Sequence, residues 1–292
     1  MPPVKTWSTP QKNEKKSEIP CALCGESSLF KPSIIYEGLS YARCGRCGLV
    51  QINPQPLHAE IMNRYDQGDD YLCYELTNEK PFLDLQVLAL GDAGFWPLET
   101  ELKAAMGQRG QIPKVLDIGC ATGALLGELK SRGWDCTGIE ISHSQAQYSR
   151  EKRGIPVHER PLEDCCFPDA AFDAVLASHL IEHLNNPASF VSEVRRILKA
   201  KGRFLVTTPN IGGFQAKLFR GKWRSAIFDH LYLFSVKTLS SLLKKSGFGI
   251  EKISTWGGLA AGIAPLPVKR FFDKAAKRFG FGDVMIIRAV KV

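Results

Sequence analysis

Residues 115–123, with the sequence Val-Leu-Asp-Ile-Gly-Cys-Ala-Thr-Gly, contain the pattern that decides the fold. An apolar run over residues 114–118 ends in this glycine-bearing turn, and apolar residues then recur at helical spacing over residues 124–132. The pattern predicts a strand, a tight turn and a helix. Glycines in such a turn let the backbone approach a ligand, and the helix directs its first N–H groups toward that ligand. We therefore expect a nucleoside-containing ligand at this turn.

A carboxylate follows the next apolar run and supports the same ligand class. Glu140 stands seventeen residues after Gly123, where it can accept hydrogen bonds from both hydroxyls of an adenosine ribose. Dinucleotide-binding loops have the form Gly-x-Gly-x-x-Gly. The loop of this chain is Gly119-x-x-x-Gly123 instead, with Cys120 and Ala121 between the two glycines. The loop therefore disfavours a pyrophosphate, although the loop alone also fits an ordinary glycine turn of another α/β protein.

The rest of the central region alternates between strand and helix patterns. After a polar helix that ends at Gly154, the expected elements are strands at 156–158 and 172–177, a helix at 187–198 and a strand at 204–207. Such alternation predicts an α/β fold, in which a mostly parallel sheet has helices on both faces.

These motifs resemble the class I S-adenosylmethionine-dependent methyltransferases. Their first motif, acid-x-Gly-x-(Gly or small)-x-Gly, is matched by Asp117, Gly119, Ala121 and Gly123. The resemblance covers about half of the chain and implies a Rossmann-like sheet of seven strands with S-adenosylmethionine as methyl donor. It also implies that residues 284–290 form the closing seventh strand.

The resemblance assigns cofactor-binding roles position by position. The turn would flank the methionine and adenosine portions, Glu140 would hold the ribose, and Leu162 and Glu163 would lie near the adenine ring. Pro161 stands where many relatives have an acidic residue, so their side-chain contact to the adenine amino group is not expected here. The residues expected to bind the cofactor are Asp117, Gly119, Cys120, Gly123, Glu140, Leu162, Glu163 and Ser178.

Two Cys-x-x-Cys pairs near the N-terminus predict a structural zinc ribbon. The pairs are Cys21 with Cys24 and Cys44 with Cys47, and their separation fits a tetrahedral site of four thiolates. A closed four-sulfur site leaves no open position for catalysis. The alternative, disulfide pairing, requires an oxidising compartment. Because the other five cysteines are scattered and no signal segment or long apolar span is evident, we expect reduced thiols and a cytoplasmic protein.

A comparable ribbon precedes the methyltransferase domain in deoxysugar C-methyltransferases and in some ribosomal RNA guanine methyltransferases. In the deoxysugar enzymes an acid-histidine pair and a histidine after the fourth strand line the active site. On that resemblance Asp229, His230 and His179 are the expected catalytic residues, with His230 as the base. A histidine suits proton removal because its ordinary pKa lies near neutrality. The large C-terminal domain of those enzymes has no counterpart here, which disfavours a sugar-nucleotide acceptor.

The sequence 182–184, Glu-His-Leu, is similar to the small-molecule methyltransferases that include the ubiquinone-pathway O-methyltransferases. In those relatives acidic residues and a histidine at this place can bind a divalent ion. We favour a hydrogen-bonding role at a helix start for Glu182 and His183. The later aromatic residues Trp223, Phe228, Tyr232 and Phe234 are expected to line an organic acceptor pocket.

Composition leaves three function classes open. The chain has 292 residues, 44% hydrophobic content and a net charge of +8, as in an ordinary enzyme with local basic clusters. The preferred interpretation is methyl transfer to a small organic acceptor. Clusters of basic residues at 217–224 and in the last 25 residues keep an RNA methyltransferase as the alternative. A non-catalytic zinc-ribbon interaction protein is the third class, and the oligomeric state is not evident from the sequence.

Five segments are expected along the chain. They are a flexible tail (1–19), the zinc ribbon (20–56), a helical connector (57–110) with Tyr65, Tyr71 and Tyr74 in packing roles, the S-adenosylmethionine-binding domain (111–256), and an amphipathic helix with the closing strand (257–292). The helix would bury Phe271, Phe272, Ala275 and Phe279 on the domain. Contact of this basic helix with an anionic membrane is the alternative.

Overall fold

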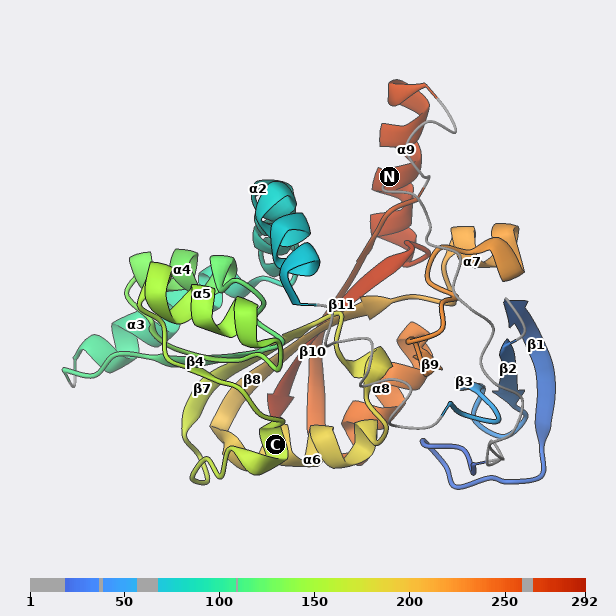
Figure 1. Cartoon of the computed structure of the whole chain (residues 1–292), viewed down its shortest axis with the longest axis horizontal. Coiled ribbons are helices and arrows are strands. Elements are labelled where there is room, and N and C mark those ends of the chain that lie inside the picture. The colour runs from blue at the N-terminus through green and yellow to red at the C-terminus, as the bar shows by residue number, and fades with distance from the viewer. Residues whose placement is uncertain (1–18, 37–38, 57–67, 109, 259–264) are drawn as a thin grey trace.

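A seven-stranded sheet with helices on both faces forms the centre of the computed structural model, which describes residues 19–36, 39–56, 68–108, 110–258 and 265–292 (Figure 1). The strand order is β10-β11-β8-β7-β4-β5-β6, and only β11 runs antiparallel to its neighbours. The strands are β4 (Lys114–Ile118), β5 (Asp135–Ile139), β6 (Val157–His158), β7 (Phe172–Ser178), β8 (Leu198–Pro209), β10 (Phe248–Trp256) and β11 (Val284–Lys291). The Rossmann-like sheet and its closing strand are thus confirmed.

The helices over 124–131, 143–153 and 187–197 form where the sequence predicts them, whereas it does not predict the helix over 214–219. They are α2 (Gly68–Asp92), α3 (Phe95–Gly107), α4 (Ala124–Ser131), α5 (His143–Arg153), α6 (Pro187–Ile197), α7 (Phe214–Phe219), α8 (Val236–Lys245) and α9 (Leu266–Phe279). Three short 3₁₀ turns join them: η1 (Leu162–Asp164), η2 (Ile181–His183) and η3 (Arg220–Lys222). At the start of α6 the Asn186 side chain accepts the Ser189 N–H, and Pro187 occupies the first turn. Because α6 leads into β8 without a loop, β8 begins earlier than residue 204.

The two faces of the sheet carry separate apolar cores. One core joins the sheet to α3, α4 and α5, and the other joins it to α6, α8 and the N-terminal ribbon. Figure 1 shows α4 and α5 on one side of the strands and α6 and α8 on the other. Parallel pairing aligns the carboxyl ends of β4 and β5, where ligands of open α/β sheets bind.

A second sheet connects the N-terminal ribbon to a later part of the chain. Its strands are β1 (Phe30–Tyr36), β2 (Leu39–Cys44), β3 (Val50–Ile52) and β9 (Tyr232–Leu233), all antiparallel. Val50 pairs with Leu233 and Gln51 with Tyr232. The ribbon therefore shares its sheet with the segment that directly follows His230.

The part of the connector that the structure describes before the large sheet consists of α2 and α3. Tyr65 and the side chain of Tyr71 lie outside the described residues, as does the tail up to residue 18. The Tyr74 ring lies 6.1 Å from that of Phe82 in α2, in keeping with its expected packing role. Within the described ranges, every helix is too short or too polar to cross a bilayer.

The expectation that α9 buries its phenyl face is wrong for Phe271 and Phe279, while Phe272 and Ala275 are half-buried. Phe271 and Phe279 are 69% and 73% exposed, whereas Ala276 is fully buried. Among the α9 side chains whose burial is described, Ala276 is the buried one, and its carbonyl accepts the Thr255 hydroxyl. The rings of Phe271 and Phe279 therefore reach solvent instead of packing on the domain.

Candidate functional site

The turn after β4 satisfies its own backbone donors. The N–H groups of Gly119 and Cys120 donate to the Ile139 carbonyl at 2.8 and 3.0 Å, and that of Gly123 donates to the Cys120 carbonyl at 2.9 Å. The Ala121 N–H donates to Glu140 Oε2 at 3.0 Å. A phosphate cradle uses such N–H groups for the ligand. Their internal use here therefore agrees with the spacing argument against a pyrophosphate.

The two glycines of the turn, Gly119 and Gly123, have different surroundings. Both have positive φ angles, +75° at Gly119 and +74° at Gly123. A Cβ at Gly123 would lie 2.1 Å from Ser149 Oγ, so this glycine lets α5 pack beneath the turn. A Cβ at Gly119 would meet only Leu180, at 3.7 Å or more. The side of the turn at Gly119 is consequently the more open one.

Two buried carboxylates lie beside the turn. Asp117 is 3% exposed in β4, and Glu140 is 9% exposed directly after β5. Burial, with a contribution from the Glu140 charge, raises the pKa of Asp117 to about 7. Burial also raises the pKa of Glu140, although its hydrogen bonds from Ser142 and Ala121 oppose that shift. A cation would offset the cost of ionising this pair.

The two buried carboxylates, Asp117 and Glu140, fit S-adenosylmethionine. Each carboxylate oxygen can accept more than one hydrogen bond, so Glu140 retains acceptor capacity while it holds Ala121 and Ser142. The sulfonium and ammonium groups of that compound supply positive charge, whereas the pyrophosphate of a dinucleotide would add negative charge next to Asp117. The electrostatics therefore favour the sulfonium nucleoside.

The other residues expected to bind the cofactor differ in burial and in position relative to the turn. Cys120 is buried, and its Sγ lies so close to Gly138 that a Cβ there would be 2.6 Å away. Leu162 is buried in η1, and Glu163 in the same turn is exposed. Ser178 ends β7 at the same edge of the sheet as the turn. The structure thus brings Asp117, Gly119, Gly123 and Glu140 together, while the Cys120 side chain packs into the interior.

A second group of ionisable side chains surrounds the buried Glu182. Its Oε2 accepts the Thr208 hydroxyl at 2.9 Å, and its Oε1 lies 3.3 Å from His179 Nδ1. Burial raises the pKa of Glu182, but the His179 hydrogen bond and the nearby histidines outweigh it and lower the pKa to about 2. These contacts agree with the hydrogen-bonding role expected for Glu182.

The tautomer of His230 follows from its partner. Its Nδ1 lies 2.8 Å from the Ser225 carbonyl, which can only accept, so Nδ1 carries the proton and Nε2 the lone pair. Burial lowers the pKa of His230 below its usual value, against the opposing charges of Glu182 and Asp229. A neutral imidazole with an unprotonated Nε2 is a competent general base.

His183 and His230 lie side by side although 47 residues separate them. Their ring centroids are 4.7 Å apart and nearly perpendicular, and His183 Nδ1 donates to the Asp229 carbonyl at 2.9 Å. With Glu182 they offer three ligand atoms within 4.8 Å of one another. The sequence indicates Glu182 and His183 as a candidate ion site. It does not indicate that His230 lies beside them, because no local pattern predicts a contact between residues so far apart in the chain.

The expected aromatic lining is largely wrong. Trp223, Tyr232 and Phe234 are each 1% exposed, whereas Phe228 is partly exposed. The pairing of β9 with β3 places Tyr232 inside the second sheet, and its hydroxyl donates to the Asn185 carbonyl. These rings therefore support the loop around His230 from the interior.

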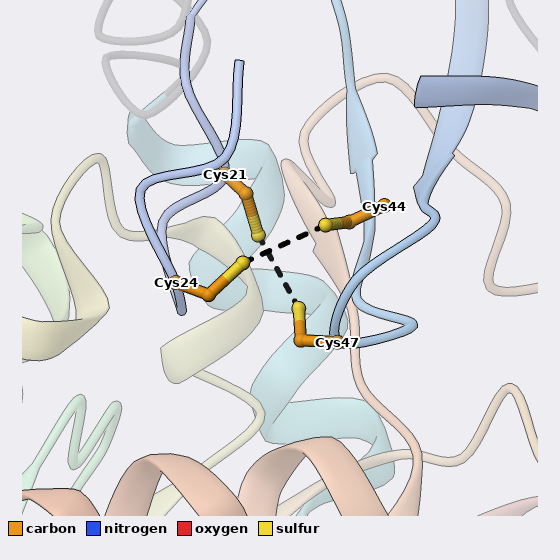
Figure 2. A group of neighbouring side chains, drawn as sticks. All are labelled: Cys21, Cys24, Cys44 and Cys47. Carbon is orange, nitrogen blue, oxygen red and sulfur yellow. Dashed lines mark hydrogen bonds between the residues drawn. The ribbon is translucent and has the colours of Figure 1, made fainter. Parts of the chain in front are cut away.

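The four ribbon cysteines converge as free thiols, as Figure 2 shows. The Sγ atoms of Cys21 and Cys47 are 3.4 Å apart, and those of Cys24 and Cys44 are 3.6 Å apart. A tetrahedral zinc with Zn–S bonds of about 2.3 Å requires S–S separations of about 3.8 Å. The four sulfurs therefore fit a zinc ion with small adjustments.

The ribbon also contacts the loop that carries the expected base. The Tyr41 side chain is fully buried, and its hydroxyl lies 2.6 Å from the Ile227 carbonyl oxygen and 2.9 Å from that of His230. Sequence reasoning assigned no functional role to Tyr41. The contact spans nearly 190 residues of chain, beyond the reach of any spacing argument.

Comparison with known proteins identifies the domain. Residues 95–253, more than half of the chain, match the family described as the methyltransferase domain. The chain belongs to this family. It is a class I methyltransferase by the order of its strands and by its first motif.

Its relatives include enzymes of small-molecule methylation. The chain is 32% identical to a probable S-adenosylmethionine-dependent methyltransferase of Mycolicibacterium smegmatis, over 53% of this chain and 59% of that protein. It is 30% identical to the demethylmenaquinone methyltransferase of Tropheryma whipplei, over 61% of this chain and 74% of that protein. The match to the mycobacterial protein thus spans less than two thirds of that relative.

A solved methyltransferase from Thermotoga maritima, described as a possible histamine N-methyltransferase, aligns with 24% identity. The alignment covers 70% of this chain and 96% of that one, with a TM-score of 0.49.

Proposed function

We propose that this chain transfers a methyl group from S-adenosylmethionine to a small organic acceptor. The observation that carries the proposal is the buried pair Asp117 and Glu140 beside the Gly119 turn, at the same edge of the sheet as the neutral base His230. When bound, S-adenosylmethionine supplies an activated methyl group. The protein's part is to hold the acceptor close and to remove a proton where the acceptor requires it.

The proposed roles follow from the contacts. Glu140 accepts the ribose hydroxyls, and Asp117 favours positive charge at the turn. His230 Nε2 accepts the acceptor's proton, while the Ser225 carbonyl fixes the ring through Nδ1. Asp229 binds His183 through its carbonyl, which orders the residue before His230. His179, with a side chain 49% exposed, is the solvent-exposed member of this group.

We also propose a structural zinc held by Cys21, Cys24, Cys44 and Cys47. The ion would stabilise the ribbon, and through β3 and Tyr41 the ribbon would hold the His230 loop. Zinc has no part in the methyl transfer itself, because four thiolates complete its coordination.

A small organic acceptor is supported by the relatives named above, since they include a demethylmenaquinone methyltransferase. Incubation with methyl-labelled S-adenosylmethionine and a fractionated cell extract tests this choice. Label in a metabolite fraction, at a rate insensitive to salt, is the expected result. Label in RNA, with a rate that falls steeply as salt rises, would favour the RNA alternative because counterion release makes such binding salt-dependent.

Replacing Glu140 with alanine is expected to weaken S-adenosylmethionine binding by about 1.5–3 kcal/mol, the range for a lost hydrogen bond to a charged group. Calorimetric titration measures the change, and Glu151→Ala on the exposed side of α5 is the matched control. The melting temperature of the ligand-free variant reports any loosening of the turn. Unchanged affinity would remove Glu140 from the ribose site.

Affinity for S-adenosylmethionine is expected to depend on pH through Asp117. Below its pKa of about 7 this carboxyl is protonated and offers the cation no charge, so affinity should fall as the pH drops below 7, by about tenfold per pH unit at most. Above 7 the affinity should level off. Titrations across this range should show the slope in the wild type and a clearly smaller slope in Asp117→Asn, where Glu140 is the remaining buried carboxyl. A pH-independent wild type would contradict the role of Asp117.

A further inference from the structure

The outer surface of α7, η3 and α9 combines exposed apolar side chains with basic ones, and we call it the α7–α9 surface. Its exposed apolar residues are Phe214, Leu218, Val268, Phe271 and Phe279. Its exposed basic residues are Lys217, Arg220, Lys222, Arg270, Lys274, Lys277 and Arg278, of which Lys277 pairs with Asp92 in α2. Contiguous apolar exposure of this kind marks an interaction site, and the methyl-transfer chemistry proposed above makes no use of it.

The two helices form one continuous surface. The rings of Phe214 and Phe272 lie 6.3 Å apart, and the Phe214 N–H donates to the Phe281 carbonyl at 2.9 Å. In Figure 1, α7 lies beside the base of α9, and α9 projects away from the sheet. The exposed surface therefore extends across both helices, although they are distant in the sequence.

The apolar and the basic residues of α9 lie on different sides of the helix. Val268, Phe271, Ala275 and Phe279 follow helical spacing along one stripe, and Arg270, Lys274 and Arg278 lie on its outer flank. The one acidic residue in α7, η3 or α9 is Asp273, which accepts the Gly258 N–H and pairs with Lys269. The solvent side of the surface is thus apolar or positive.

The α7–α9 surface lies at the functional edge of the sheet. Helix α7 follows the carboxyl end of β8, and α9 connects the carboxyl end of β10 to the start of β11. The pairing of Val284 with both Pro209 and Trp256 puts these ends level with each other. A partner bound here would face the edge that carries the Gly119 turn and His230.

We propose that the α7–α9 surface binds an anionic lipid bilayer. A helix with a phenyl stripe and a basic flank lies in the membrane interface, with the rings among the acyl chains and the cations at the head groups. Negative lipid head groups complement the basic side chains, and the exposed phenyl rings suit the acyl chains of a bilayer. Docking would bring the carboxyl edge of the sheet close to the bilayer surface.

Sedimentation with vesicles tests this proposal without any measurement of activity. The full chain should bind vesicles of equal parts phosphatidylglycerol and phosphatidylcholine at least about tenfold more tightly than vesicles of phosphatidylcholine alone, and binding should weaken with salt. The double variant Phe271→Ser/Phe279→Ser and the triple variant Arg270→Ser/Lys274→Ser/Arg278→Ser should each lose about tenfold or more. Ile112→Ser, at a residue 61% exposed before β4, should bind like the wild type.

Other outcomes would overturn the proposal. Equal binding to both vesicle types, or full binding by the Phe271/Phe279 variant, would show that the surface does not enter a bilayer. Concentration-dependent association of the chain that this variant abolishes would assign the surface to a second copy. RNA binding lost in the triple variant, without vesicle binding, would assign it to nucleic acid.

Discussion

Replacing His230 with alanine is expected to lower the turnover number by about 100- to 10,000-fold, the range for loss of a general base. The affinity for S-adenosylmethionine should change little, because Asp117 and Glu140 lie on other elements. The rate is measured with the metabolite fraction that accepts the labelled methyl group. His143→Ala, at a side chain 76% exposed, is the matched control and should keep wild-type turnover.

A second variant separates catalysis from loop structure. Asparagine at position 230 can still donate to the Ser225 carbonyl as Nδ1 does, but it has no basic Nε2. If His230 is the base, His230→Asn should be as slow as His230→Ala. Recovery of turnover in the asparagine variant would mean that His230 only orders the loop.

Replacing Cys24 with serine is expected to release zinc and unfold the ribbon. Apparent zinc-binding free energies of cysteine sites are about 10–16 kcal/mol, and that energy stabilises the folded ribbon. Metal analysis of the purified protein gives the zinc content, and Cys73→Ser, at an exposed thiol in α2, serves as the control. Full zinc stoichiometry in Cys24→Ser would contradict the four-sulfur site.

Loss of the ribbon should also slow catalysis. Its strand β3 pairs with β9, and the Tyr41 hydroxyl holds the carbonyls of Ile227 and His230. Turnover should therefore fall together with zinc content, while the affinity for S-adenosylmethionine is retained. Chelation of zinc from the wild type should reproduce the effect if Cys24→Ser cannot be purified. A zinc-free protein with wild-type turnover would show that the ribbon does not position this loop.

Local patterns predicted most of the central fold. The strand, turn and helix around Gly119 follow from apolar periodicity and glycine chemistry within about twenty residues, and the closing strand over residues 284–290 follows from the family resemblance. The convergence of Cys21 and Cys24 with Cys44 and Cys47 was likewise predicted by their spacing. Each of these features is encoded by neighbours in sequence or by a motif of fixed geometry.

Contacts between distant segments were not predictable in the same way. Strand β9 has only two residues, too few for a periodicity that would predict its pairing with β3. The contacts of the Tyr41 hydroxyl depend on that pairing. The approach of His183 to His230 has the same origin. For α9 the phenyl periodicity was evident, but which part of that helix meets the body depends on the packing around Ala276.

Calorimetric titration of the full chain with S-adenosylmethionine and, separately, with NAD tests most directly whether the Gly119 turn, Asp117 and Glu140 form a sulfonium-nucleoside site. The account predicts saturable binding of S-adenosylmethionine, weakened in Glu140→Ala, and no binding of NAD. Binding of NAD, or failure to bind S-adenosylmethionine at a pH above 7, would contradict it.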